Sequence, residues 1–130
     1  MEDQFKARIT VQSVSCGANH TAFVTTVGTV YCCGHNQHGQ CGTGDSGEYK
    51  RKPTLVQSNS IKGWFTKRFI QAACGGEHTL LLADDGLAFA FGNNTNGQLG
   101  DGTRKPTNLP VVVKETKSLT KVCGVRCGLV

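Results

Sequence analysis

The hexapeptide pattern C-G-x-x-H-T occurs twice in the chain, as Cys16-Gly17-Ala18-Asn19-His20-Thr21 and as Cys74-Gly75-Gly76-Glu77-His78-Thr79. The copies are 58 positions apart, since 74 − 16 = 58. So many coincidences in one register indicate an internal repeat. At this offset, and without a gap, the following residues also coincide: Gly28 with Gly86, Gly34 with Gly92, Asn36 with Asn94, Gly39 with Gly97, Gln40 with Gln98, and Gly42 with Gly100.

A third copy begins near the C-terminus. Residues 11–17 have the form V-x-x-V-x-C-G, and residues 122–128 repeat it with Cys127 and Gly128 at its end. A register on Cys123 is the alternative, but it fits the apolar spacing less well. The second spacing is five residues shorter than the first, since 127 − 74 = 53. We expect the difference to lie in residues 57–68, which include Trp64 and are predicted to be a loop insertion.

Each period reads as four short strands. Short apolar runs at 21–25 and 79–83 are each followed by a turn signal, Val27-Gly28 or Asp85-Gly86. Repeats of this length with four strands are typical of propeller blades. The predicted fold is therefore all-β, a partial β-propeller of about two four-stranded blades plus the start of a third. The predicted division is a lead-in at 1–10, a first repeat at 11–56, the insertion at 57–68, a second repeat at 69–113 and the start of a third at 114–130.

The repeated pattern C-G-x-x-H-T, followed by G-x-N-x-x-G-Q-x-G-x-G and P-x-x-V, resembles the repeat of the regulator of chromosome condensation family. The resemblance covers Val11 to Gly128 and implies a propeller, usually of seven blades. Where that family often has Trp before the Gly that ends the hairpin, this chain has Cys33 and Phe91. Two repeats and part of a third cannot close a ring. The chain is therefore expected to be a fragment, a truncated product or one contributor to a shared propeller.

Bulk composition excludes several classes of protein. Gly makes up 17 of 130 residues without a G-X-Y period, and charged residues make up 18%. Collagen and intrinsic disorder are therefore both disfavoured. The N-terminus has no apolar segment of a secretory signal, and no stretch is long and apolar enough to cross a membrane. Seven cysteines without a signal predict free thiols in a reducing compartment, cytoplasmic or nuclear.

The densest group of potential metal ligands lies in the first repeat. Cysteine and histidine are the residue types that bind zinc, and the group comprises Cys32, Cys33, His35, His38 and Cys41. The second repeat provides a control, because its equivalent residues are Ala90, Phe91, Asn93, Asn96 and Leu99. Small or apolar side chains therefore satisfy this scaffold, and we predict packing rather than a metal site.

The Cys and His of the hexapeptide invite a second chemical interpretation, a Cys–His nucleophile. Cys16 and Cys74 recur at one repeat position together with His20 and His78, whereas a catalytic thiol is needed only once. We therefore expect these His side chains to hydrogen-bond a turn to a neighbouring strand. The glycine-rich loops lack the G-K-[ST] ending of a phosphate loop. No catalytic, cofactor or metal residue is predicted.

Function is consequently expected in the variable loops. The net charge of +5 and a candidate basic rim, formed by Lys50, Arg51, Lys52, Arg104 and Lys105, would suit an acidic protein or, with weaker support, nucleic acid. The primary prediction is a non-enzymatic protein-interaction module. The family resemblance alone implies the alternative, a guanine-nucleotide exchange factor for a small Ran-like GTPase, associated with chromatin. Open blade edges also predict self-association.

Overall fold

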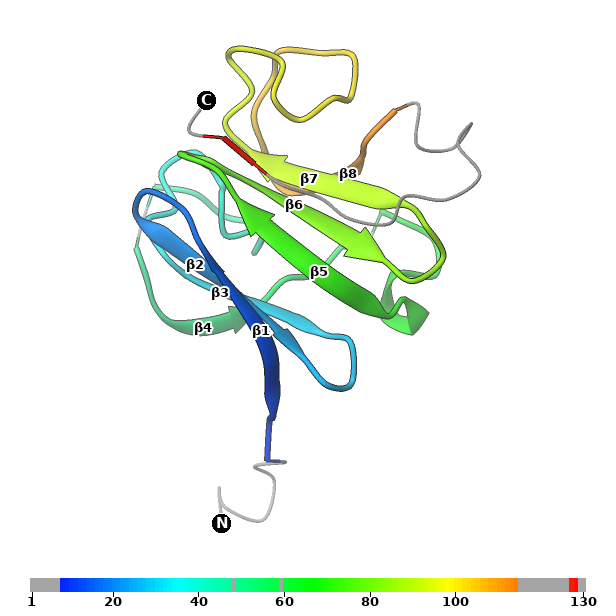
Figure 1. The fold of residues 1–130 in the computed structure, drawn as a ribbon. Coiled ribbons are helices and arrows are strands. Elements are labelled where there is room, and N and C mark those ends of the chain that lie inside the picture. Colours follow the sequence, from blue (N-terminus) through cyan, green and yellow to red (C-terminus); the bar gives the residue numbers. More distant parts are fainter. Residues whose placement is uncertain (1–7, 48, 59, 115–126, 129–130) are drawn as a thin grey trace.

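The chain folds into two four-stranded antiparallel sheets (Figure 1). The computed structural model describes residues 8–47, 49–58, 60–114 and 127–128. Both sheets are meanders in which consecutive strands are neighbours, and we refer to them as blade 1 and blade 2. Blade 1 contains β1 (Val11–Cys16), β2 (His20–Thr25), β3 (Val30–Gly34) and β4 (Lys50–Leu55). Blade 2 contains β5 (Phe69–Cys74), β6 (His78–Ala83), β7 (Ala88–Gly92) and β8 (Thr107–Val112).

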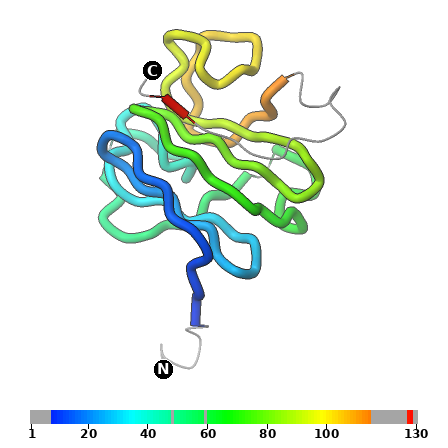
Figure 2. The backbone as a smooth tube through the Cα atoms, viewed as in Figure 1, coloured from blue at the N-terminus to red at the C-terminus, as the bar shows by residue number. Residues whose placement is uncertain are grey.

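The two blades repeat each other's register, so the predicted all-β fold with four strands per repeat is confirmed. Phe23 on β2 faces Tyr31 on β3, and Leu81 on β6 faces Phe89 on β7. The β2–β3 turn closes where Gly28 donates its N–H to the Thr25 carbonyl at 3.0 Å, as Gly86 does to Ala83. Gly28 has φ of 87°, a left-handed conformation that glycine adopts without steric cost. In the tube of Figure 2 the two meanders follow parallel courses.

The hydrophobic core lies between the facing surfaces of the two blades. Mostly small side chains on blade 1 pack with mostly large ones on blade 2 in one core cluster. Blade 1 contributes Ala22, Val24, Val30 and Cys32, all at most 2% exposed, and blade 2 contributes Leu81, Ala83, Phe89 and Phe91, all 0% exposed.

The connection between the blades is more than a surface loop. It contains a single 3₁₀ turn, Trp64–Thr66, and the Trp64 side chain is only 5% exposed. The indole ring lies 4.9 Å from Phe69 and 5.5 Å from Phe89, centroid to centroid. The sequence predicted an insertion here but not that its tryptophan would complete the inter-blade core. No helix among the described residues is long and apolar enough to cross a membrane.

The outer strands β4 and β8 have protected edges. Pro53 and Pro110 occupy equivalent positions and provide no N–H for a further strand. In each blade a threonine hydroxyl also donates to the carbonyl just before the proline, from Thr54 to Lys52 at 2.9 Å and from Thr107 to Leu109 at 2.8 Å. Proline on an edge strand discourages edge-to-edge pairing. Self-association through open blade edges stays a prediction, and these two prolines oppose it at β4 and β8.

Candidate functional site: the seam between the blades

A chain of buried hydrogen bonds joins the two hexapeptides across the seam. The Thr79 hydroxyl donates to the Gln40 carbonyl at 2.8 Å, which uses its only proton. It must therefore accept at its 2.8 Å contact with His20 Nε2, so His20 is the neutral tautomer protonated at Nε2. Burial lowers the pKa of His20 to about 4. The imidazole is thus a neutral donor at physiological pH.

The glycine of the hexapeptide makes room for its histidine. A Cβ on Gly17 would overlap the Gly75 carbonyl oxygen and would lie 2.7 Å from His20 Nδ1. Gly75 stands in the same relation to His78 and to the Gly128 carbonyl. Only glycine therefore allows the ring to lie against its own turn while the next repeat approaches. The predicted role of His20 as a tie between a turn and a neighbouring strand agrees with this geometry.

The repeated cysteine bonds the strand of the preceding repeat. Cys74 Sγ lies 3.4 Å from the Ser15 carbonyl and Cys127 Sγ lies 3.0 Å from the Ala73 carbonyl. Burial raises the pKa of Cys74 to about 11 and that of Cys127 to about 12, so both are protonated thiols that donate weakly. The parallel contacts support a third repeat registered on Cys127. Cys123 lies outside the described residues.

The repeated Asn and Gln shape the glycine-rich loops from within. Asn36 Oδ1 accepts the Cys41 N–H at 3.0 Å, and Asn94 Oδ1 accepts the Leu99 N–H at the same distance. Gln40 Oε1 accepts the His38 N–H at 2.9 Å, and Gln98 Oε1 accepts that of Asn96 at 2.8 Å. Each side chain satisfies backbone donors that a tight loop would otherwise leave unpaired.

The loop of blade 1 also docks on blade 2. Gly44 donates its N–H to the Asn108 carbonyl at 2.9 Å, and a Cβ on Gly39 would lie 2.5 Å from Asn108 Cα. Gly42 also lies across the seam, against Phe91, whereas other repeated glycines pack within their own blade: Gly34 against His20, Gly92 against His78, and Gly100 against Val113.

The Cys and His residues of the first repeat are each engaged separately. Cys32 is buried in the core, and Cys41 Sγ lies 3.5 Å from the His35 carbonyl. His35 Nδ1 accepts from Gln40 at 3.0 Å, while His38 Nε2 lies 2.9 Å from Glu77 across the seam. Burial raises the pKa of Cys32 well above its ordinary value and that of Cys41 to about 12. Within the described ranges, no group of three such side chains is arranged to hold a metal ion.

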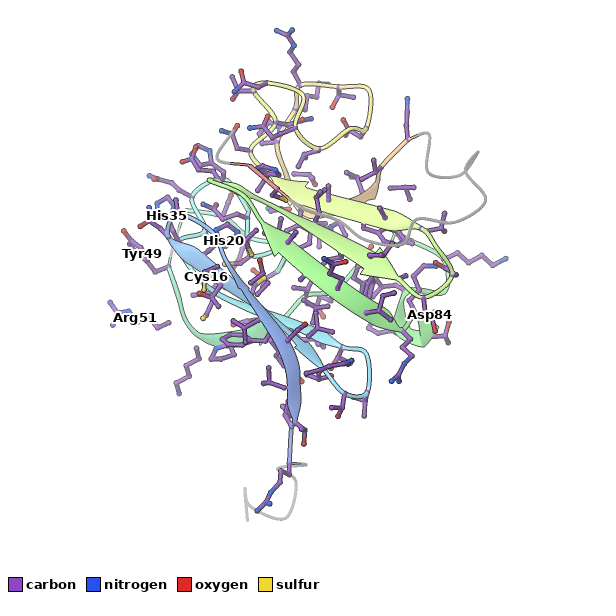
Figure 3. All side chains as sticks on the ribbon, viewed as in Figure 1. Cys16, His20, His35, Tyr49, Arg51 and Asp84 are labelled. Atoms are coloured by element: carbon purple, nitrogen blue, oxygen red, sulfur yellow. The ribbon has the colours of Figure 1, made fainter. Side chains whose placement is uncertain are left out.

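The candidate basic rim is divided between two places. Lys50, Arg51 and Lys52 lie on β4, whereas Arg104 and Lys105 lie in the loop before β8 of the other blade. Figure 1 shows β4 and this yellow-to-orange loop on different sides of the molecule, and Arg51 projects from the β4 side in Figure 3. Lys50 forms an ion pair with Asp45 at 2.6 Å. The structure therefore does not bring these cations into one patch.

Sequence reasoning gave no role to several residues of the seam. Thr79 accepts the hydrogen bond from His20, and Ser15 Oγ accepts the Cys74 N–H at 3.0 Å. The Glu77 carboxylate contacts His38 Nε2 and accepts a hydrogen bond from the Asn93 side chain. A signal existed only for Thr79, because threonine closes both copies of the hexapeptide. Ser15 and Glu77 are Ala73 and Asn19 in the other copy, so the repeat provided no cue.

Two four-stranded meanders packed face to face, with the same residues joining successive repeats, define this protein as a segment of a β-propeller. Comparison with known protein families then identifies the type of repeat. The regulator of chromosome condensation (RCC1) repeat matches residues 27–82 and 85–129, and a second description of that repeat matches 11–40 and 69–98. The chain belongs to the regulator of chromosome condensation repeat family.

Its relatives are larger proteins. The chain is 32% identical over 120 residues to the human E3 ubiquitin-protein ligase HERC2, covering 91% of this chain and 2% of that protein. It is 42% identical over 95 residues to mouse protein RCC2, covering 73% of the chain and 17% of the relative. The chain thus spans less than a fifth of either relative.

Solved structures show the same fold. Human WBSCR16 matches with a TM-score of 0.69 at 30% identity, over 83% of this chain and 26% of that one. Prp20p from Saccharomyces cerevisiae matches with a TM-score of 0.74 at 20% identity, over 93% and 30%. The latter likeness concerns the fold alone.

Proposed function

We propose that this chain is a non-enzymatic protein-interaction module. The supporting observation is that recurring polar residues are used within the fold, either in joining the blades or in shaping the glycine-rich loops. His20, Gln40 and Thr79 bond one another, and Cys74 is bonded to Ser15. Burial raises the pKa of Cys74 to about 11 and lowers that of His20 to about 4, so this thiol stays protonated and this imidazole is a weak base, unlike the Cys–His pair of a nucleophilic enzyme. Binding is then assigned to the exposed loops that vary between repeats.

Competition capture followed by calorimetry tests this proposal. The immobilised chain is expected to retain at least one protein that excess free chain displaces, and the purified partner should bind with a stoichiometry of one. A partner that free chain fails to displace, or none at all, would contradict the proposal. The Gly39→Ala variant, in which the blade seam is disturbed, is the matched control for binding that needs the folded blades.

Exchange activity toward a small Ran-like GTPase is the second candidate. Its support is the likeness to Prp20p, whose reported structure concerns binding to Gsp1p and histones. A second yeast RCC1 (Prp20) structure, with a TM-score of 0.70, is bound to Kap60. Release of fluorescent GDP from a purified Ran-like GTPase is the test. Unchanged release at saturating chain excludes this candidate and leaves the first one standing.

The remaining features of the proposal concern location and partners. We place the protein inside the cell, in the cytoplasm or nucleus, and the six described cysteines, all free, are consistent with a reducing compartment. Nucleic acid is a minor partner in this proposal, because the five basic rim residues are spread over two separate elements and one is already paired with Asp45.

A further inference from the structure

The connection between the blades is a rigid platform. Ser58 is 1% exposed, and its hydroxyl accepts the Ile61 N–H at 3.2 Å. Lys67 donates its N–H to the Trp64 carbonyl at 3.1 Å, which closes the 3₁₀ turn. Thr66 then donates both its N–H and its hydroxyl to the Gly63 carbonyl. The backbone of this short segment is therefore held by its own hydrogen bonds.

Two consecutive aromatic residues on this platform point in opposite directions. Trp64 is 5% exposed and packs against Phe69 and Phe89, whereas Phe65 is 77% exposed. Phe65 is the most exposed of the large hydrophobic side chains among the described residues. Because the turn that carries Phe65 is already ordered, covering this side chain with a partner costs little backbone freedom.

Phe65 lines two recesses. One, of about 60 Å³, also contacts Leu55, Val56 and Gly28 of blade 1. The other, of about 260 Å³, lies across the seam and is lined by Thr43 and Gln57 together with Leu109 of blade 2. Aromatic anchors beside pockets are the usual centres of binding energy at protein interfaces.

The charges of the segment narrow the class of partner. Residues 57–68 contain Lys62, Lys67 and Arg68 and no acidic residue. Lys67 is paired with Asp85 at 2.8 Å, and Arg68 donates to the Thr26 carbonyl at 2.8 Å. Lys62 is exposed, with no such contact among the described residues. One uncommitted cation, three residues before Phe65 in the sequence, suits a protein segment better than a nucleic-acid backbone, which needs several phosphate contacts.

We propose that Phe65 and its two recesses form a docking surface for a partner protein that presents an apolar side chain next to a carboxylate. The apolar side chain would fill the larger recess against Leu109, Phe65 would be covered by the partner, and the carboxylate would face Lys62. A second copy fits less well, because a symmetric contact would bring the two positive segments together. This inference rests on the proposed interaction function and assigns it a surface.

Selection of random dodecapeptides on phage against the intact chain tests the inference. The expected peptides combine an aliphatic or aromatic residue with Asp or Glu. By fluorescence anisotropy a selected peptide should bind Phe65→Ser at least tenfold more weakly than wild type. The matched control is Val27→Ser, since Val27 is 71% exposed on the β2–β3 turn and should change binding less than twofold. Both variants should keep the wild-type melting temperature, because both side chains are in solvent.

Three results would overturn the inference. Peptides that bind Phe65→Ser as tightly as wild type would place the docking surface elsewhere, while leaving the interaction function intact. Binding of a fluorescent oligothymidine that Phe65→Ser abolishes and Val27→Ser does not would make nucleic acid the ligand. A dimer in light scattering that Phe65→Ser dissociates would make a second copy the occupant. Failure of competition capture, by contrast, would reject the interaction function itself.

Discussion

The two blades share local structure but not surroundings. The face of β6 and β7 that holds Thr79, Leu81 and Phe89 is covered by blade 1, whereas the equivalent face with Phe23 and Tyr31 is only partly buried. The glycine-rich loops differ in the opposite sense. Gly39 is buried against Asn108, while Gly97 is exposed, with no described atom within 4 Å of a Cβ placed on it. Equivalent residues of the two repeats are therefore expected to contribute differently to the free energy of unfolding, because different neighbours pack on them.

Substitution of the two loop glycines should give the largest difference. Gly39 and Gly97 have similar φ values, 79° and 71°, so alanine costs the same left-handed backbone strain in both, about 1–2 kcal/mol. Gly39→Ala also forces a Cβ to within 2.5 Å of Asn108 Cα, and overpacking adds about 1–3 kcal/mol. Urea unfolding should thus show Gly39→Ala to be the more destabilised. Equal losses would mean that the loop of blade 1 is not docked on blade 2.

Acid should weaken the seam through His20. Its pKa is about 4 in the folded chain and about 6.5 when unfolded, because burial disfavours the imidazolium. Between pH 6.5 and 4 the unfolded state binds a proton that the folded state does not. The free energy of unfolding therefore falls as the pH falls, by about 3 kcal/mol over this range. Burial also lowers the pKa of His78, which acts in the same direction.

Urea denaturation at pH 7.5 and pH 4.5 measures this dependence. His20→Gln, which keeps a donor but does not titrate, should have a flatter pH profile than wild type. The carboxyl groups of Asp45, Asp85 and Asp101 have pKa values below their ordinary range, so they titrate mostly at lower pH. An unchanged profile in His20→Gln would remove His20 as the cause.

The two threonines of the hexapeptides offer an isosteric comparison. Thr79→Val leaves His20 Nε2–H without an acceptor and the Gln40 carbonyl without a donor, which should cost about 2 kcal/mol. Thr21→Val removes only a 3.9 Å contact with Cys16 Sγ and should cost less than about 0.5 kcal/mol. Thermal unfolding of both variants tests the difference. Similar melting temperatures would show that the seam hydrogen bonds contribute little.

Thiol labelling of the wild-type protein should show the same contrast between an open repeat position and its equivalent in the seam, without any substitution. Cys16 is exposed on the open face, whereas Cys74 is 8% exposed in the seam and its pKa is raised to about 11. Because the thiolate is the reactive form, N-ethylmaleimide should modify Cys16 at least about tenfold faster. Peptide mass spectrometry over time resolves the two sites. Comparable rates in the native protein would indicate that the seam opens freely, and labelling in urea is the control.

Much of the fold was predictable because the two copies of the repeat can be aligned with each other. The register of Phe23 with Tyr31 and the turn at Gly28 follow from apolar runs and turn residues that lie close together in the chain. The preference for packing over a zinc site at Cys32 to Cys41 stays a prediction that rests on the same comparison of repeats. The burial of Trp64 was not predicted, because its partners Phe69 and Phe89 belong to the second blade and nothing in the insertion repeats.

The sequence by itself determined what is local and recurrent in this protein: strands, turns, family, and the glycine that allows His20 to lie against its own backbone. Tertiary structure alone decided which residues meet across the seam. His20 is a donor at Nε2 because Thr79 has committed its proton to Gln40, and Cys74 stays a protonated thiol because burial in the seam raises its pKa. Burial and desolvation depend on the neighbouring blade, and no local pattern encodes them.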